Sequence, residues 1–252
     1  MIRLTRRFLF LSAAVLAVLP GVAAQAASTQ VAVAANFTDA AKDIAKAFQE
    51  KTGDEAVLSF SATGQFYTQI TQGAPFEVFL AADDDRPTRA VKEGFGVEGT
   101  VFTYAIGQLV LFSQNADTVK GEETLKANAF AKLAIANPES APYGAAAIET
   151  LKALKLYDAI QPKIVQGTSI AQAYQFVQTG NAELGFVALG QVVNEKGGSR
   201  WDVPQDLYTP IRQDAVLLKT GEGNAAAKAF VDFLKTPEAL EIIRRYGYRT
   251  GE

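Results

Sequence analysis

Short apolar runs alternate with amphipathic segments along most of the chain. Near the start, residues 31–35 place valines between small residues, as a short buried strand would, and Asn36 ends the run with a side chain that favours helix N-caps. Apolar residues at i, i+4 spacing then predict a helix over residues 40–51. We expect a strand that changes directly into a helix at Asn36, with Asp39 placed to reach back to the N–H of this cap.

The same alternation continues to the C-terminus. Further strands are expected at residues 55–60, 76–82, 101–113, 133–136, 163–165, 184–189 and 215–219, and further helices at residues 65–72, 86–93, 145–156, 170–178, 224–235 and 237–246. The longest of the β-rich runs could serve two sheets in succession. Alternating strands and helices favour an α/β fold with mainly parallel sheets covered on both faces.

The length and the order of the elements predict two lobes. A chain of 252 residues exceeds the usual single domain, and with 48% hydrophobic residues it can bury a sizeable core. We expect residues 27–106 and 217–252 to form the first lobe and residues 107–216 the second. The segments at these boundaries are strand-like, which predicts a two-stranded hinge.

The N-terminus has the pattern of a secretory signal peptide. Three arginines precede an apolar run over residues 8–19 that is too short to span a bilayer, and Ala24-Gln25-Ala26 is an A-x-A cleavage site. We expect ordinary secretion with removal of residues 1–26, the cut falling after Ala26 or Ala27. Removing this segment changes the net charge from −3 to −6, which argues against nucleic acid or an anionic membrane surface as partner.

The chain contains no cysteine and no histidine. Disulfides, a lipid anchor on an N-terminal cysteine, Ser-His-Asp and Cys-His catalytic arrangements, and the common zinc sites are therefore excluded. Carboxylates, hydroxyls, amides and the backbone remain as chemical groups. The exported protein should be soluble and not embedded in a membrane.

Four strand-to-helix junctions have a neutral, small or hydroxylated core. They are Ala35-Asn36, Ala62-Thr63-Gly64, Pro142-Tyr143-Gly144 and Thr168-Ser169-Ile170. In open α/β sheets ligands bind at the carboxyl ends of strands, and two lobes would bring two junctions each to one cleft. Free N–H groups and the positive ends of helix dipoles there would hold a small anion. From the residues alone, four ordinary N-caps are the simpler interpretation, because nearly every helix has one.

Five segments, taken in order, resemble the periplasmic molybdate-binding proteins of ABC transporters. They are Val-Ala-Ala-Asn-Phe at 33–37, Ser-Ala-Thr-Gly-Gln-Phe-Tyr-Thr-Gln-Ile at 61–70, Gly-Ala-Pro-Phe-Glu-Val-Phe-Leu-Ala-Ala-Asp at 73–83, Ala-Asn-Pro-Glu-Ser-Ala-Pro-Tyr-Gly at 136–144 and Arg-Arg-Tyr-Gly-Tyr at 244–248. The similarity spans essentially all of the mature chain. It implies the type II periplasmic binding-protein fold, with molybdate or tungstate in the interlobe cleft and no cofactor or metal counter-ion. It also implies a binding protein rather than an enzyme, a monomer that delivers the oxyanion to an inner-membrane permease.

The resemblance also implies which residues hold the oxyanion. Asn36 would donate its N–H and side-chain amide, and Thr63 its N–H and hydroxyl, while the other positions contribute mainly backbone N–H groups. The expected set is Ala35, Asn36, Thr63, Tyr143 and Ile170. Ala188 stands where some members offer a tyrosine hydroxyl, so either the site makes one contact fewer or Asn36 and Tyr143 compensate. Donors alone select a fully deprotonated ion, because a protonated oxyanion would set its O–H against another donor.

Two alternatives remain at this point. The protein could be a receptor for another tetrahedral oxyanion, such as sulfate or phosphate. It could instead be a secreted metal-dependent hydrolase that uses the acidic turn Asp83-Asp84-Asp85 to hold Mg²⁺ or Ca²⁺. A simpler role for this turn is to cap and charge the following helix, with Asp83 as the cap.

Overall fold

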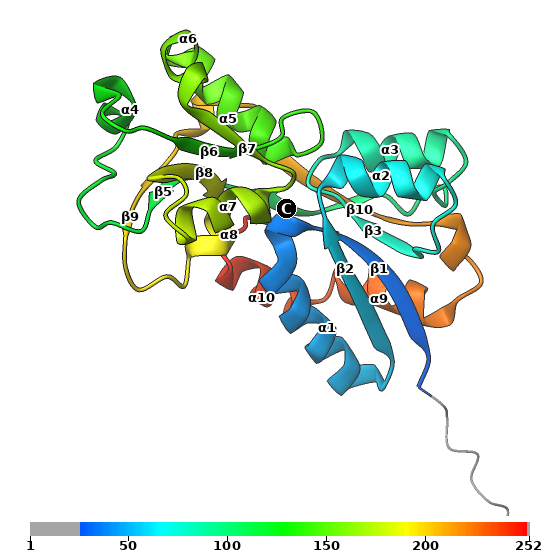
Figure 1. Ribbon diagram of the computed structural model, residues 1–252. Coiled ribbons are helices and arrows are strands. Elements are labelled where there is room, and N and C mark those ends of the chain that lie inside the picture. The colour runs from blue at the N-terminus through cyan, green and yellow to red at the C-terminus, as the bar shows by residue number, and fades with distance from the viewer. Residues whose placement is uncertain (1–25, 251–252) are drawn as a thin grey trace, which may run out of the picture.

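The computed structural model describes residues 26–250, so the expected signal peptide lies outside the described residues apart from its last one. Two lobes are visible, each built on a five-stranded sheet (Figure 1). The strand order is β2-β1-β3-β10-β4 in the first lobe and β7-β6-β8-β5-β9 in the second. Within residues 26–250, no helix combines the length and the apolar character that a membrane crossing requires.

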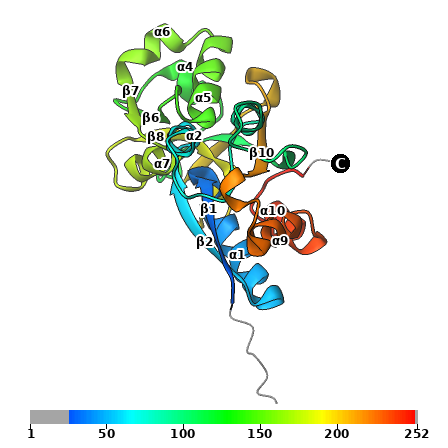
Figure 2. The same ribbon diagram turned by 90° about the vertical axis from the view of Figure 1, so that its right-hand side faces the viewer.

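The first lobe takes its elements from both ends of the chain. Its strands are β1 (Ser28–Ala34), β2 (Glu55–Ser61), β3 (Val78–Leu80), β4 (Phe102–Gly107) and β10 (Ile211–Leu217). Its helices are α1 (Thr38–Thr52), α2 (Thr63–Thr71), α3 (Asp85–Lys92), α9 (Ala225–Phe233) and α10 (Pro237–Arg245), with 3-10 turns η1 (Ala35–Phe37) and η4 (Lys219–Gly221). Contacts join α10 to α1 and α9 to β1 (Figure 2).

The second lobe is formed by the middle of the chain. Its strands are β5 (Leu109–Ser113), β6 (Leu133–Ala136), β7 (Ile164–Gly167), β8 (Leu184–Ala188) and β9 (Ser199–Asp202). Its helices are α4 (Glu123–Ala127), α5 (Pro142–Ala153), α6 (Tyr157–Ile160), α7 (Ile170–Gln178) and α8 (Leu189–Val192), with 3-10 turns η2 (Gln161–Lys163) and η3 (Gln205–Leu207).

The hydrophobic pattern of each element explains its packing. In α1 the i, i+4 residues Ile44 and Phe48 are fully buried, and the ring of Phe48 meets that of Phe230 edge-on at 5.2 Å between centroids. The central strand β6 is buried at all four positions, as expected of a strand covered on both faces. Each lobe therefore has a core of its own, and small first-lobe residues such as Ala62 and Ala82 pack against the core of the second lobe.

Each sheet is parallel in one half and antiparallel in the other. β1 pairs in parallel with β2 and β3, and β6 with β7 and β8, so the carboxyl ends of these strands share one edge in each lobe. The strands next to the lobe crossings, β10 and β5, pair antiparallel with their neighbours. The parallel halves are the ones that carry the four junctions.

The chain crosses between the lobes twice. Only Gln108 separates β4 from β5, and residues 203–210 lead from β9 back to β10. Ile211 at the start of β10 pairs with Gly107 at the end of β4, so the two crossing segments lie side by side. A segment near the C-terminus joins the crossing segments, because Arg249 and Ile106 of β4 exchange backbone hydrogen bonds of 3.0 and 2.7 Å.

The strand pairing corrects the expected return to the first lobe. We placed it at residue 217, but β10 pairs with β3 and β4 from Ile211 onward, so residues 211–216 belong to the first sheet. The reason is the polar stretch Arg212-Gln213-Asp214, which interrupts the apolar pattern although the last two of these residues are buried. β9 is missing from the expected strands for a similar reason, since it is a short polar strand at the edge of its sheet.

Candidate anion-binding site

The four predicted junctions meet in one small cavity between the lobes. Its lining consists of Ala34, Ala35, Asn36, Ala62, Thr63, Ala82, Ala141, Pro142, Tyr143 and Ile170. All five residues that we expected to bind the ligand are among them. The cavity measures ≈ 10 Å³, which is room for about one water-sized group, so any larger ligand, a tetrahedral oxyanion included, enters only when the lobes move apart.

Three helices begin at this cavity and direct backbone N–H groups to it. Thr63 and Ile170 are the first residues of α2 and α7, and Tyr143 is the second residue of α5. The N–H groups of a first helical turn have no carbonyl partner in their own helix. No partner is found for these three N–H groups anywhere in residues 26–250. With the positive ends of three helix dipoles beside them, they form a strong site for a negative charge.

The Thr63 hydroxyl is held so that its proton stays available. Its oxygen accepts a hydrogen bond from the N–H of Ala82 at 3.0 Å, and the residue is only 1% exposed. A hydroxyl has a single proton, and this bond leaves that proton free. Thr63 can therefore donate twice to one anion, through its N–H and its hydroxyl.

Asn36 is placed differently from what the sequence predicted. It lies inside the 3-10 turn η1, and α1 begins only at Thr38 with no side-chain cap, so the expected N-cap at Asn36 is wrong. Its amide nitrogen instead donates to Gln213 Oε1 at 2.7 Å and to Tyr248 Oη at 3.3 Å. These buried partners compete successfully for the amide, which is why the local cap does not form.

The residues around Asn36 complete this arrangement. Tyr248 Oη donates to the carbonyl oxygen of Asn36 at 2.6 Å, which ties the C-terminal segment to the first junction. Asp39 accepts from Lys42 at 3.3 Å and is not engaged with the N–H of Asn36. At the second lobe, Ala188 is fully buried at the end of β8 and does not line the cavity. At this position the chain therefore packs a methyl group in the core and offers no hydroxyl to the cavity.

Two hydrogen bonds hold the lobes together at the edge of the cavity. The N–H of Gly64 donates to the carbonyl of Ser140 at 2.9 Å, and the guanidinium of Arg86 donates to the carbonyl of Glu139 at 3.0 Å. Both acceptors belong to the loop that leads into α5. These contacts therefore fix the N-terminus of α5 in the second lobe relative to α2 and α3 in the first. Arg86 is not among the expected site residues, although its position three residues after Asp83 favours the ion pair that forms.

The acidic turn is arranged around arginines. Asp83 forms an ion pair with Arg86 and also accepts its backbone N–H at 3.0 Å, while burial raises the pKa of this carboxyl and Arg86 opposes the rise. Asp84 and Asp85 lie 3.9 and 3.7 Å from two other arginines, Arg212 and Arg89. Among residues 26–250, no three acidic side chains converge in a way that could hold a metal ion. The turn therefore does not present the gathered carboxylates that a metal-dependent hydrolase needs.

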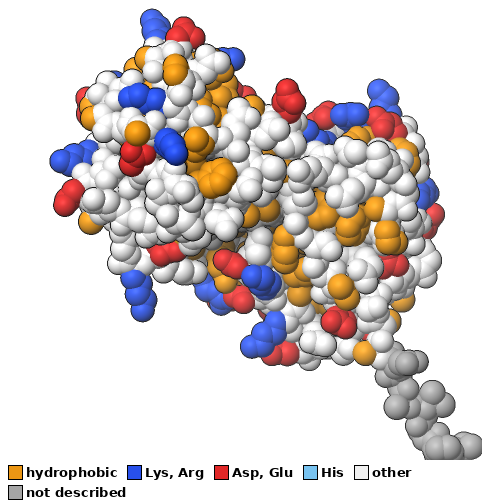
Figure 3. Space-filling view, in the orientation of Figure 1, with side chains coloured by type: hydrophobic (Ala, Val, Ile, Leu, Met, Phe, Trp, Pro, Cys, Tyr) orange, Lys and Arg blue, Asp and Glu red, His pale blue; other side chains and the backbone are white. Residues whose placement is uncertain are grey.

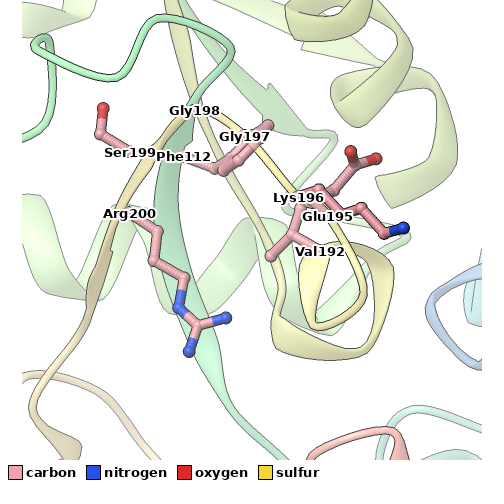
Figure 4. A pocket seen from close by; sticks show the side chains of 8 residues that line it. All are labelled: Phe112, Val192, Glu195, Lys196, Gly197, Gly198, Ser199 and Arg200. Atoms are coloured by element: carbon pink, nitrogen blue, oxygen red, sulfur yellow. The ribbon is translucent and has the colours of Figure 1, made fainter.

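A larger surface hollow in the second lobe does not bring hydrogen-bond donors together as the interlobe cavity does. It measures ≈ 250 Å³ and is lined by Phe112, Val192, Glu195, Lys196, Gly197, Gly198, Ser199 and Arg200. The charged side chains of Glu195, Lys196 and Arg200 point in three different directions (Figure 4). The visible face of the molecule likewise shows basic and acidic side chains mixed, without a patch of one sign (Figure 3). We therefore place the site in the interlobe cavity.

Comparison with known proteins identifies the family. The model of the bacterial extracellular solute-binding proteins matches residues 29–249. The chain belongs to this family. The solute-binding protein is 58% identical over 240 residues to the molybdate-binding protein ModA of Rhodobacter capsulatus, covering 94% of this chain and 95% of that protein. It is 59% identical over 230 residues to ModA of Azotobacter vinelandii, covering 90% and 91%.

A solved structure agrees with the sequence comparison. The periplasmic molybdate-binding protein of Azotobacter vinelandii superimposes on this solute-binding protein with a TM-score of 0.86 at 38% identity, over 89% of this chain and 100% of that one. The expected family and the expected two-lobed periplasmic binding-protein fold are thereby confirmed. The relatives named here are binding proteins and not enzymes.

Asp84→Asn should leave ligand binding by this solute-binding protein unchanged. The carboxylate of Asp84 is more than half exposed and its one ion-pair partner is Arg212, at 3.9 Å. An exposed ion pair of this kind contributes little free energy. Titration calorimetry with molybdate tests this expectation. A large loss of affinity would mean that the acidic turn takes part in binding.

Arg86→Gln should weaken molybdate binding about tenfold. The bond from its guanidinium to Glu139 joins the two lobes only when they are closed, and a hydrogen bond from a charged donor contributes about 1.5 kcal/mol. Arg89→Gln is the matched control, because Arg89 lies one turn further along α3 and pairs only within its own lobe. Equal affinities of the two variants would show that the contact does not stabilise the closed form.

Proposed function

We propose that this protein binds molybdate in the interlobe cavity and delivers it to the permease of an ABC importer. The observation that carries the proposal is the meeting of uncharged donors from both lobes in one small cavity. Among the described residues, no lysine, arginine or carboxylate lines it. The names of the relatives that are 58% and 59% identical over most of this chain support molybdate as the ligand.

The proposed ligand contacts are backbone N–H groups and two polar side chains. Ala35, Asn36, Thr63, Tyr143 and Ile170 are the residues that we assign to the oxyanion. Hydrogen bonds to a charged group contribute about 1.5–3 kcal/mol each, so five to seven of them support sub-micromolar binding after the cost of closing the lobes. Tungstate has the same charge and the same donor requirement, and we include it among the ligands.

Capture by local dipoles fits the charge of the protein. The mature chain, with a net charge of −6, cannot attract a dianion through its overall field. Donors fixed in a closed cavity retain their strength because little water competes with them. The ligand touches both lobes and so favours the closed form, which is the form that the permease would recognise.

The proposed place of action is the periplasm. The basic and apolar N-terminus with its A-x-A site supports export and cleavage near residue 26. We propose that the mature protein acts as a monomer that diffuses between the ligand and the membrane-bound transporter.

Thermal unfolding of the protein without residues 1–26 tests the proposed ligand. Molybdate, tungstate, sulfate and phosphate are added in turn, and a ligand at 100 times its dissociation constant stabilises the folded state by about 2.7 kcal/mol. A rise in Tm with molybdate and tungstate alone is the expected result. A rise with sulfate or phosphate alone would make the protein a receptor for another oxyanion, and no rise with any of the four would refute the proposal.

A further inference from the structure

Tyr248 lies behind the first junction and binds its backbone. Its hydroxyl donates to the carbonyl oxygen of Asn36 at 2.6 Å, and its ring meets the ring of Phe37 edge-on at 5.1 Å between centroids. A carbonyl oxygen can only accept, so the proton of this hydrogen bond comes from the tyrosine. Burial raises the pKa of the Tyr248 hydroxyl above its ordinary value, which keeps that proton in place at neutral pH. Tyr248 itself is not among the residues that line the cavity.

The turn that Tyr248 holds has few other supports. The 3-10 turn η1 receives no side-chain cap from the described residues, and neither does the N-terminus of α1 that follows it. The other supports are the hydroxyl of Thr38, which donates to the carbonyl of Ala35 at 2.8 Å, and the side-chain contact of Asn36 with Gln213 at 2.7 Å. Of these hydrogen bonds, the one from Tyr248 holds the carbonyl group at the centre of the turn.

The two ends of η1 have opposite polarity. In a helical turn the N–H groups point toward the N-terminus and the carbonyl groups point the other way. Ala35 and Asn36 line the cavity, and their N–H groups belong to a first turn, where no carbonyl of the same helix accepts them. A donor on the carbonyl of Asn36 therefore holds the turn from behind and leaves these N–H groups to an anion. It also polarises the peptide groups in the direction that strengthens them as donors.

The ring of Tyr248 packs against the second lobe. A methyl group added to Gly190 of α8 would lie 2.6 Å from Tyr248 Oη and 2.7 Å from a carbon of its ring, so only a glycine leaves room for the tyrosine there. The preceding residue fits as closely, because a methyl group on Gly247 would lie 2.8 Å from a side-chain carbon of Leu189. Tyr248 is therefore held between a turn of the first lobe and a helix of the second.

We propose that Tyr248 is a positioning residue of the anion site, which packs on α8 of the second lobe and sets the N–H donors of η1 in the first. Its hydroxyl contacts the carbonyl of Asn36 and not the ligand, so its effect on binding passes through the N–H groups of Ala35 and Asn36. The segment at residues 244–248, which the family resemblance includes, thereby acquires a role in binding. The inference rests on the proposed function, because it assumes that these groups donate to an oxyanion.

Tyr248→Phe tests this role, because it removes the hydroxyl and keeps the ring. We expect the dissociation constant for molybdate to rise about fivefold or more, as the loss of one oriented hydrogen bond predicts. Tyr246→Phe is the matched control, since Tyr246 lies two residues earlier and its hydroxyl donates to Asp43 at 2.9 Å, away from the cavity. The control should bind as the unaltered protein does. Titration calorimetry measures both variants.

The backbone N–H signals of the proposed donors distinguish positioning from a general loss of stability. In ¹⁵N-labelled protein saturated with molybdate, the signals of Ala35 and Asn36 should shift less in Tyr248→Phe than in the unaltered protein. The signals of Thr63 and Ile170 should shift by the same amount in both proteins. A variant that is merely less stable would show the full shift at all four N–H groups once it is saturated.

Gly190→Ala is a second variant, and it leaves the hydroxyl in the chain. Its methyl group would displace the ring of Tyr248 from α8, so the same selective loss of the Ala35 and Asn36 shifts is expected. Gly197→Ala is its control, because no atom of residues 26–250 lies within 4 Å of a methyl group added there. If Tyr248→Phe does not fold, Gly190→Ala carries the test.

Unchanged molybdate affinity in Tyr248→Phe, or equal shifts at all four N–H groups, would overturn the positioning role of Tyr248. Where Gly190→Ala carries the test, the same two results in that variant have the same meaning. An unaltered protein that does not bind molybdate at all would instead refute the proposed function.

Discussion

Thr63→Ala lowers the affinity for molybdate by about 10- to 100-fold and leaves the protein folded. The hydroxyl proton of Thr63 is free because its oxygen is occupied by the N–H of Ala82, and a hydrogen bond to a charged group contributes about 1.5–3 kcal/mol. The same substitution leaves the Ala82 N–H without its partner, so the free energy of unfolding should fall by about 1–3 kcal/mol. Calorimetric titration and thermal unfolding measure the two effects separately.

The control for Thr63 lies in the same helix. Thr68 is exposed, and its hydroxyl donates to the carbonyl of Gly64 on the outside of α2. Thr68→Ala should therefore bind molybdate normally, and Thr63→Ser should retain most of the affinity because it keeps the hydroxyl. If Thr63→Ala binds as tightly as Thr68→Ala, Thr63 is not a ligand of the anion.

Gly144→Ala reduces both stability and molybdate binding. A methyl group at this position would lie 2.2 Å from the carbonyl oxygen of Ala136 and 2.8 Å from its carbon. These are backbone atoms at the end of the central strand β6, which cannot move aside as a flexible side chain would. Overpacking of this kind costs about 3 kcal/mol of folding free energy. Because the start of α5 must move away from the end of β6, the N–H of Tyr143 is displaced as well.

Gly197→Ala is the matched substitution for Gly144. Gly197 lies in a surface loop of the same lobe, with no atom within 4 Å of an added methyl group among the described residues. The free energy of unfolding of the Gly197→Ala variant should differ from that of the unaltered protein by no more than about 0.5 kcal/mol. Urea unfolding of both variants compares them. Equal stability of the two variants would contradict the close approach of α5 to β6.

The strand-to-helix junctions were predictable because they depend on neighbouring residues. An apolar run followed by a small or hydroxylated residue and then a 3.6-residue period is enough to place the starts of α2 and α7. The two-sheet interpretation of residues 101–113 was confirmed for the same reason, since β4 and β5 are separated by Gln108 alone. Elements that depend on distant partners were missed or misplaced, above all the polar first half of β10.

The contacts behind the site depend on partners that are far apart in the sequence. Asparagine is a residue type that is typical of N-caps. Nothing near Asn36 in the sequence indicates that Gln213, 177 positions away, competes for its amide. Burial of Gln213 follows only from its strand lying between two others. The family resemblance supplied the five proposed ligand residues, whereas the hydrogen bonds that orient them required the three-dimensional structure.

The position of bound molybdenum shows directly whether the interlobe cavity is the binding site. A crystal of the mature protein grown with molybdate, measured on both sides of the molybdenum absorption edge, locates the metal atom by its anomalous scattering. We expect one strong peak between the N-terminus of α5, the N-terminus of α7, Thr63 and Asn36. A peak at the acidic turn or in the hollow beside Arg200, with none in the interlobe cavity, would contradict it.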